Sequence, residues 1–180
     1  QIDIFDGGEK PVRVELDRNL DGTLDQVQHY NKNFILQYVE KDSKYSGMID
    51  WREVYGADNK VTRLETDENR NGRMDVFQYF SENGHLARVE YDTFHDGKID
   101  RWEFFGAKEA LESVHFDTNH DQIPDQWQYY NNSTQLVRVE HDSNFDGKAD
   151  RWEYFDDFGS MERIEFDNDH DGTLDIVKRR

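Results

Sequence analysis

The chain has 180 residues, of which 34% are hydrophobic, 34% charged and 14% aromatic. This apolar fraction is small for one large globular core, whereas the aromatic fraction is too high for a disordered chain. The formal net charge of −18 disfavours a nucleic-acid partner, because phosphates are recognised by Lys and Arg. The absence of Cys excludes disulfides, a thiolate nucleophile and Cys-based zinc sites. No apolar run is long enough to predict a transmembrane helix.

A repeat of 25 residues organises the chain, because a leading Asp recurs at this spacing without a slip. A trailing Asp follows each leading Asp after eight residues. We therefore predict one repeat domain over residues 1–180, consisting of an N-terminal cap at residues 1–11 and seven repeats. The leading residues are Asp17, Asp42, Asp67, Asp92, Asp117, Asp142 and Asp167, and the trailing residues are Asp25, Asp50, Asp75, Asp100, Asp125, Asp150 and Asp175.

Each repeat contains two segments with strand character. The segment before the leading Asp, such as residues 12–16, alternates apolar and charged residues in the period-two pattern of a half-buried strand. The segment after the trailing Asp, such as residues 101–105, is aromatic, and turn-forming residues separate it from the next repeat. The pattern predicts an all-β fold, an antiparallel β-meander or solenoid of seven two-stranded repeats. A partial β-propeller-like or rolled sheet is the alternative.

The loop between the two strands carries the chemistry. In the first repeat it runs from Asp17 to Asp25, with oxygen-bearing side chains at loop positions 1, 3, 5 and 9 and Gly22 at position 6. Ca²⁺ takes about six to eight oxygen ligands, and Gly permits the sharp turn that aims alternate side chains inward. The backbone carbonyl at position 7 would add a ligand. The pattern predicts Ca²⁺ loops, with plain Asx-turns as the bland alternative and Mg²⁺ less favoured because it demands octahedral geometry.

The repeats differ in how completely they keep this ligand set. The second repeat has Lys44 at position 3, and we expect its ammonium group to replace the ion by pairing with Asp42 and Asp50. The fourth repeat has Phe94 at position 3, so that a water would have to take this place. In the fifth repeat Gln122 replaces the turn Gly and must adopt a less favourable backbone conformation.

We therefore expect about four to six Ca²⁺ ions, and six would reduce the formal charge to about −6. In six of the predicted sites, side chains provide most ligands, and position 7 contributes its backbone carbonyl. The predicted ligands are Asp17, Asn19, Asp21, Thr23 and Asp25; Asp67, Asn69, Asn71, Arg73 and Asp75; Asp92, Asp96, Lys98 and Asp100; Asp117, Asn119, Asp121, Ile123 and Asp125; Asp142, Asn144, Asp146, Lys148 and Asp150; and Asp167, Asp169, Asp171, Thr173 and Asp175.

These loops resemble the EF-hand calcium loop in their first nine positions. The stretch from Asp167 to Val177 is similar to the FG-GAP repeats of integrin-type propellers, in which such a loop precedes a strand. The whole repeat, with segments such as DGKIDRWEFF from Asp96, also resembles tandem repeats of bacterial surface lipoproteins and secreted proteins. The last resemblance implies a bacterial, extracytoplasmic location, which would be secreted, periplasmic or at the outer-membrane surface.

Calcium sites of extracellular modules bind at about 10⁻⁴–10⁻³ M, which suits constant occupancy by structural ions. We therefore expect a calcium-stabilised structural or docking module of a bacterial surface or periplasmic assembly, with another protein as its partner. A glycan-binding module is the alternative, because Trp102, Trp127 and Trp152 recur at one repeat position, although such Trp residues more often stack repeats. An enzyme is disfavoured, because catalysis needs one asymmetric site, and the histidines show no zinc-binding spacing.

Overall fold

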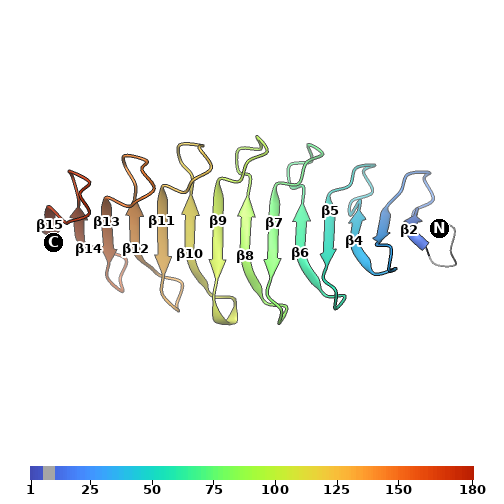
Figure 1. Ribbon diagram of the computed structural model, residues 1–180, viewed down its shortest axis with the longest axis horizontal. Helices are drawn as coiled ribbons and strands as arrows, with labels where there is room; N and C mark the ends of the chain where they lie inside the picture. Colours follow the sequence, from blue (N-terminus) through green and yellow to red (C-terminus); the bar gives the residue numbers. More distant parts are fainter. Residues whose placement is uncertain (6–10) are drawn as a thin grey trace. The chain divides into compact units, whose positions relative to one another are not determined.

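The computed structural model describes residues 1–5 and 11–180 and confirms the all-β meander. Fifteen strands form one antiparallel sheet in sequence order, so that each strand pairs with its neighbours in the chain (Figure 1). A 3₁₀ turn, η1 (Ala107–Glu109), follows β9. Among the described residues, no helix has the length and apolar character needed to cross a membrane.

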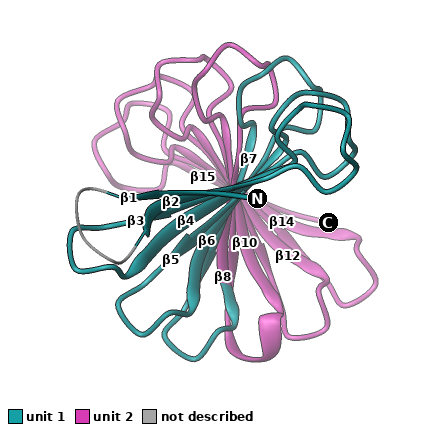
Figure 2. Ribbon diagram, turned by 90° about the vertical axis from the view of Figure 1, so that its right-hand side faces the viewer, with its two compact units in different colours: residues 1–86 teal, residues 87–180 magenta. Residues whose placement is uncertain are grey.

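The chain divides into two compact units, residues 1–86 and 87–180 (Figure 2). Of the cap predicted at residues 1–11, residues 6–10 lie outside the described residues. The first unit contains β1 (Ile2–Phe5), β2 (Pro11–Leu16), β3 (Gln26–Tyr30), β4 (Leu36–Lys41), β5 (Trp51–Tyr55), β6 (Val61–Thr66) and β7 (Val76–Phe80). The second contains β8 (Leu86–Tyr91), which begins at the boundary, β9 (Arg101–Phe105), β10 (Leu111–Phe116), β11 (Gln126–Tyr130), β12 (Leu136–His141), β13 (Arg151–Phe155), β14 (Met161–Phe166) and β15 (Ile176–Arg179).

The strand boundaries follow the repeat. Even-numbered strands are the alternating segments before the leading Asp, and the odd-numbered strands from β3 onward are the segments after the trailing Asp, which are aromatic except in β15. The predicted strand at residues 101–105 coincides with β9, and the one at residues 12–16 is extended only by Pro11. In each unit the predicted calcium loops lie along one edge of the sheet, which we call the loop edge (Figure 1). The shorter turns lie along the opposite turn edge.

The register places alternate residues on two different faces of the sheet. In the second unit, Val89, Glu103, Val114 and Gln128 are direct cross-strand neighbours in one row. The valines of such rows are buried, whereas most aromatic side chains on the strands are only partly buried. Near the turn edge the pairing shifts by one residue, as between Tyr129 and Tyr130, and such bulges bend and twist the strand.

The buried part of the sheet is unusually polar. Among the described residues, seven valines are the buried apolar side chains, whereas twelve aspartates are buried. A fold with such a small apolar core depends on how its buried carboxylates are compensated, since an uncompensated buried charge is costly. The buried aspartates are Asp25, Asp42, Asp50, Asp67, Asp75, Asp92, Asp100, Asp117, Asp125, Asp142, Asp150 and Asp167.

Candidate metal sites at the loop edge

All seven loops share positive φ at two positions, including the two loops with incomplete ligand sets. The residue at loop position 4 is left-handed in every loop, with φ between 54° at Tyr45 and 65° at His120. Position 6 also has positive φ throughout, and Gln122 adopts φ of 76° there, as its replacement of Gly predicts. The backbone at positions 4 and 6 is therefore left-handed whether or not positions 3 and 5 carry oxygen ligands, whereas the second and fourth loops alone form a turn at positions 2 and 3.

The leading Asp at position 1 organises the first half of each loop. In the third loop, the backbone N–H groups of Arg70 and Asn71 donate to Asp67 Oδ1 over 2.6 and 3.2 Å. The N–H group of Gly72 donates to Asp67 Oδ2 over 2.8 Å. Because Asp67 is only 2% exposed, these amide dipoles are its local compensation.

The trailing Asp at position 9 accepts hydrogen bonds from the start of the same loop. In the fifth loop, Asp125 Oδ2 accepts from the N–H groups of Thr118 and Asn119, and Oδ1 accepts from the Thr118 hydroxyl group over 2.7 Å. In the first loop, Arg18 stands in place of the hydroxyl residue, and the buried Asp25 Oδ1 has no hydrogen-bond partner. In the third loop, which has Glu68 at position 2, the two oxygens of Asp75 each accept a backbone N–H group instead. The loops therefore differ in whether an oxygen of the trailing Asp is left without a donor.

The acid at position 5 is exposed but held ionised. The Thr23 hydroxyl donates to Asp21 Oδ1 over 2.5 Å and the Thr23 N–H over 2.7 Å. The hydroxyl first, then this N–H and the Asn19 amide, lower the pKa of Asp21 below its ordinary value. Thr173 lowers the pKa of Asp171 in the seventh loop in the same manner. In both loops this exposed carboxylate therefore stays ionised to a lower pH than an ordinary Asp does.

Position 7, where backbone carbonyls are predicted ligands, is fixed by its own N–H group. In the six predicted sites this N–H donates to the side-chain oxygen at position 5 over 2.7–3.0 Å. The contact tightens the second half of the loop next to the Gly. The residues concerned are Thr23, Arg73, Lys98, Ile123, Lys148 and Thr173.

The seventh loop brings three carboxylates together. One oxygen each from Asp167, Asp169 and Asp175 lie within 4.8 Å of one another, so that this group could hold a metal ion. Asp167 is 5% exposed, and its Oδ1 atom has no hydrogen-bond partner, whereas its Oδ2 atom accepts from the N–H of Gly172. A buried carboxylate oxygen without a hydrogen-bond donor is destabilising, and a bound cation would compensate its charge.

The composition of position 3 explains why this loop differs. Asp169 is a carboxylate, whereas the other complete loops have an amide there, at Asn19, Asn69, Asn119 and Asn144. Within residues 1–5 and 11–180, the triad of the seventh loop is the one group of three acidic or imidazole side chains whose ligand atoms all lie within 4.8 Å of one another. In the other predicted sites the structure places the ligand side chains on one loop without bringing three carboxylates so close.

The second loop has an internal cation in place of this arrangement. The Lys44 ammonium nitrogen lies 3.4 Å from Asp50 Oδ2, which is half of the expected pairing. Asp42 instead accepts from backbone N–H groups of Lys44, Ser46 and Gly47. Burial acts to raise the pKa of Asp42, but these donors outweigh it and hold the pKa below the ordinary value.

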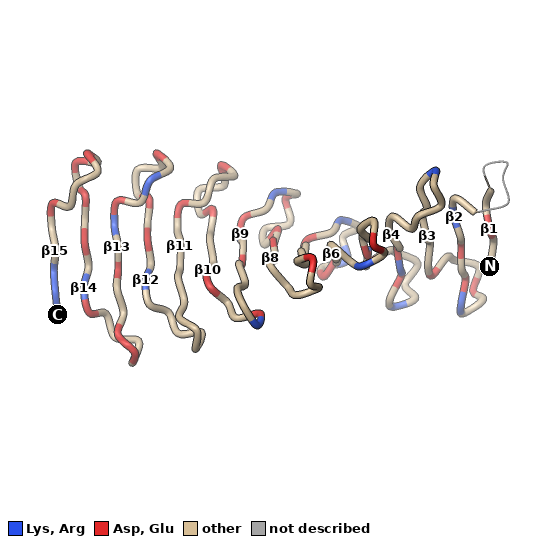
Figure 3. The backbone as a smooth tube through the Cα atoms, turned by 60° about the horizontal axis from the view of Figure 1, so that its bottom comes forward, with Lys and Arg blue, Asp and Glu red and all other residues tan. Residues whose placement is uncertain are grey.

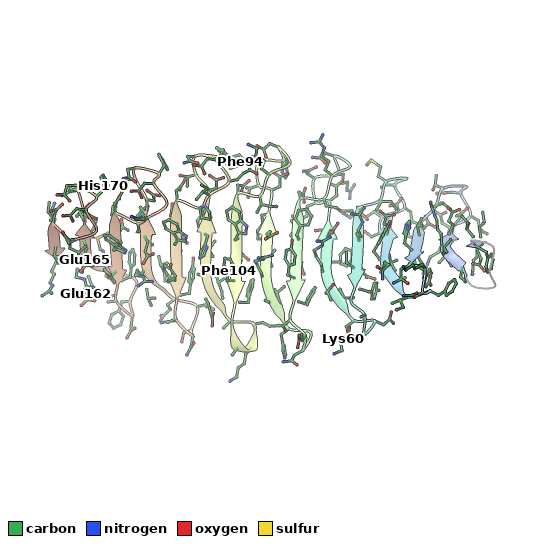
Figure 4. The ribbon with its side chains drawn as sticks, in the orientation of Figure 1. Lys60, Phe94, Phe104, Glu162, Glu165 and His170 are labelled. Atoms are coloured by element: carbon green, nitrogen blue, oxygen red, sulfur yellow. The ribbon has the colours of Figure 1, made fainter. Side chains whose placement is uncertain are left out.

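Loop position 4 contains three histidines that the sequence alone predicts to be surface substitutions. His95, His120 and His170 share this position, and their common place in the repeat was the signal that could have singled them out. The His170 Nδ1 atom lies 3.5 Å from Asp150 Oδ2 in the preceding loop. The His120 ring packs edge-on against Phe94, with 4.4 Å between ring centroids. Phe94 and His170 both lie along the loop edge (Figure 4).

Acidic residues gather where the odd-numbered strands begin. In the second unit, Figure 3 shows them at the starts of β11, β13 and β15. These are the trailing Asp125, Asp150 and Asp175. Asp125 and Asp150 lie beside the leading Asp of the next repeat, and Asp175 lies beside the leading Asp of its own repeat. The loop edge therefore concentrates negative charge that side-chain cations neutralise at few positions.

The three recurring Trp residues lie in one row on a single face. The row runs Trp102, His115, Trp127, Glu140 and Trp152 across β9 to β13. Successive Trp residues are two strands apart, which corresponds to about 9.6 Å. Each of these Trp residues is partly buried.

Comparisons with protein families and with curated sequences gave no match. The function must therefore be argued from the loop edge and the faces themselves.

Proposed function

We propose that this protein is a calcium-stabilised repeat scaffold whose loops hold structural Ca²⁺ ions. The observation that carries the proposal is the acidic triad of the seventh loop, in which the buried Asp167 Oδ1 atom lacks a hydrogen-bond donor. A divalent cation at the triad would compensate this oxygen together with Asp169 and Asp175. The oxygen-only donor set favours a hard cation, and Ca²⁺ tolerates the irregular loop geometry better than Mg²⁺ does.

The same reasoning extends the proposal to the five other complete or nearly complete loops. In the first loop, the Asp25 Oδ1 atom is buried and has no partner, as at Asp167. The leading and trailing Asp of the third to sixth loops are buried and are hydrogen-bonded largely by backbone amides. Because a carboxylate oxygen has two lone pairs, an oxygen that accepts one N–H can still bind an ion.

The net charge supplies an independent argument. With 40 acidic and 22 basic residues, the sheet must hold many carboxylates close together along one edge. Four to six ions would neutralise about 8 to 12 of these charges and would couple folding to metal binding. The ions are then part of the fold, and their removal loosens it.

A scaffold of this kind suits a location where Ca²⁺ is constantly available. We infer a bacterial extracytoplasmic location, supported by the likeness of the repeat to tandem repeats of surface and secreted proteins. The partner is another protein of a surface or envelope assembly. The acids belong to periodic loops and face pairs, and this regularity supports a binding or structural role over an enzymatic one.

The direct test is calorimetric titration of the metal-stripped protein with Ca²⁺, with circular dichroism and thermal melting recorded with and without chelator. We expect about four to six ions to bind, chelator to lower the melting temperature, and Mg²⁺ to replace Ca²⁺ poorly. The proposal fails if Ca²⁺ releases no heat and changes no melting temperature. The carboxylates would then act only as acceptors for loop amides.

A second candidate function is glycan binding on the Trp row, which the shared register of Trp102, Trp127 and Trp152 favours. Partly exposed indoles at regular spacing can stack on successive sugars of a linear polysaccharide. Trp51 is a matched control, because it stands one repeat position before the three Trp residues and pairs with Lys41 and Thr66 outside their row. Affinity electrophoresis in neutral β-linked polysaccharide gels should show retardation that W127A abolishes and W51A preserves; no retardation of the parent protein rejects this function.

A further inference from the structure

Consecutive loops are joined by their own candidate ligands. At the junction between the sixth and seventh loops, the N–H group of the leading Asp167 donates to the carbonyl group of the trailing Asp150 over 2.9 Å. The same bond recurs at the other junctions within each unit at 2.8–3.1 Å, between Asp42 and Asp25, Asp67 and Asp50, Asp117 and Asp100, and Asp142 and Asp125. The trailing Asp of one loop therefore fixes the backbone of the leading Asp in the next. Both residues are proposed ligands at the three junctions that do not involve the second loop.

Side chains at loop position 4 add a second connection. The left-handed backbone at His170 places its imidazole Nδ1 atom 3.5 Å from Asp150 Oδ2, across the junction. Asp150, Asp167 and His170 line one cleft of about 230 Å³ between these two loops. An equivalent cleft of about 190 Å³ between the first and second loops contains Tyr45 at position 4. In both clefts the position-4 side chain lies with the trailing Asp of the preceding loop.

Electrostatics does not oppose occupancy of adjacent loops. The sixth loop has three carboxylates and Lys148, and the seventh has four carboxylates, so that one Ca²⁺ in each leaves formal charges of 0 and −2. A filled loop therefore carries no net positive charge toward its neighbour. The centres of adjacent loops are separated by about two strand spacings, or about 9.6 Å, and solvent screening weakens direct repulsion between ions at this distance.

We infer that Ca²⁺ binding is coupled between consecutive loops, and that occupancy of the sixth loop increases the affinity of the seventh. The inference rests on the proposed function. An ion bound by Asp142, Asp146 and Asp150 would immobilise Asp150, whose carbonyl holds the N–H of Asp167. The triad of the seventh loop would then lose less conformational freedom when its own ion binds, which is a positive coupling.

The test removes one carboxylate from the sixth loop and measures the Ca²⁺ affinity of the seventh loop. The amide signal of Gly172 reports on the seventh loop, because its N–H donates to Asp167 Oδ2 over 2.8 Å. In the full chain with D146N, Ca²⁺ titration of this signal should show an affinity at least about fivefold weaker than in the parent protein. The control is D157N, which makes the same charge change at an exposed residue of the turn edge and should leave the affinity unchanged.

The role of position 4 is tested with H170N, since Asn tolerates a left-handed backbone. In the H170N background, D146N should weaken the seventh loop less than it does in the parent protein. Titration of the unsubstituted protein gives an independent measure that needs no variant, because coupled loops bind later ions with higher affinity. Equal Gly172 titrations with and without D146N, or independent sites in the parent isotherm, overturn the coupling while calcium binding stands. A Gly172 signal that never responds to Ca²⁺ instead rejects the proposed function.

Discussion

The loop edge and the strand faces hold their carboxylates in different ways. On the faces, Glu65 is 3% exposed and lies between Arg52 at 2.9 Å and Arg63 at 2.5 Å. At the loop edge, the equally buried Asp67 accepts hydrogen bonds from backbone N–H groups of its own loop. The faces thus carry their counter-charges within the sheet, whereas the loop edge has dipoles but few cations. This difference is the reason to look for metal ions at the loop edge.

The largest expected effect tests the faces. Replacing Glu65 with Gln removes the carboxylate that pairs with Arg63 and one of the two that pair with Arg52, which keeps Glu40. We expect a loss of about 2 kcal/mol in the free energy of unfolding. The estimate is moderate because the Arg52 and Arg63 side chains are more than one-third exposed. Urea unfolding should give the same loss with and without Ca²⁺. A loss that appears only with Ca²⁺ would contradict the separation of the two regions, and the exposed E162Q on β14 is the control.

A pair of loop-edge variants separates amide acceptors from metal ligands. Both oxygens of Asp42 accept N–H donors, so that D42N forces an amide NH₂ group against a donor and should cost about 1–2 kcal/mol without metal. At Asp167 only Oδ2 accepts a donor, and Asn can place its NH₂ group where the unpartnered Oδ1 lies. We expect D167N to leave the metal-free protein as stable as the parent, or more so.

Calcium should reverse the order of stability of these two variants, so that D167N is the less stable one when Ca²⁺ is present. In calorimetry, D167N should bind one ion fewer than the parent protein, whereas D42N should bind the same number because Lys44 already pairs with Asp50 in that loop. Thermal melting in chelator and in Ca²⁺ measures the stability of each variant. An unchanged ion number in D167N would remove the seventh loop from the proposed sites.

The regularity of the repeat made the fold accessible from sequence. Alternation in residues 12–16 and the aromatic run in residues 101–105 predict strands that coincide almost residue for residue with β2 and β9. The sequence could not predict whether the strands form a single meander or a closed or propeller-like sheet. Curvature depends on the twist between neighbouring strands and on bulges such as the one at Tyr130, and short-range patterns do not encode their sum.

The sequence identified the loop edge but not the differences among its loops. A motif weighs Asp67 and Asp167 equally, yet Asp67 has donors for both oxygens and Asp167 does not. The hydroxyl of Thr118 occupies an oxygen of its trailing Asp, and no ligand motif includes that position. Side-chain orientation within a shared backbone decides these points, and a single sequence does not specify it.

A smaller effect concerns the loop backbone. Here the fifth loop is compared with the first, which has the same types of side-chain ligand but Gly22 at position 6. Gln122 adopts φ of 76° at position 6, and six other loops have Gly there. Q122G should therefore relieve strain and stabilise the metal-free protein by up to about 1 kcal/mol, partly offset by the greater freedom of Gly in the unfolded chain. Chemical unfolding in chelator measures the change. Destabilisation would show that Gln122 contributes a contact that outweighs its backbone strain.

The smallest effect returns to the faces and appears only at alkaline pH. Burial first, and then the hydrogen bond from the Tyr55 hydroxyl to Glu53 over 2.7 Å, raise the pKa of Tyr55 from 10.0 to about 12. Because the folded pKa is the higher one, this contribution to stability is fully present below pH 10 and is lost as the pH rises toward 12. The stability difference between the parent protein and Y55F should therefore be constant below pH 10 and shrink between pH 10 and 12. Urea unfolding in chelator across this range measures the difference, and a difference that does not change with pH would show that the Glu53 carboxylate is compensated without Tyr55.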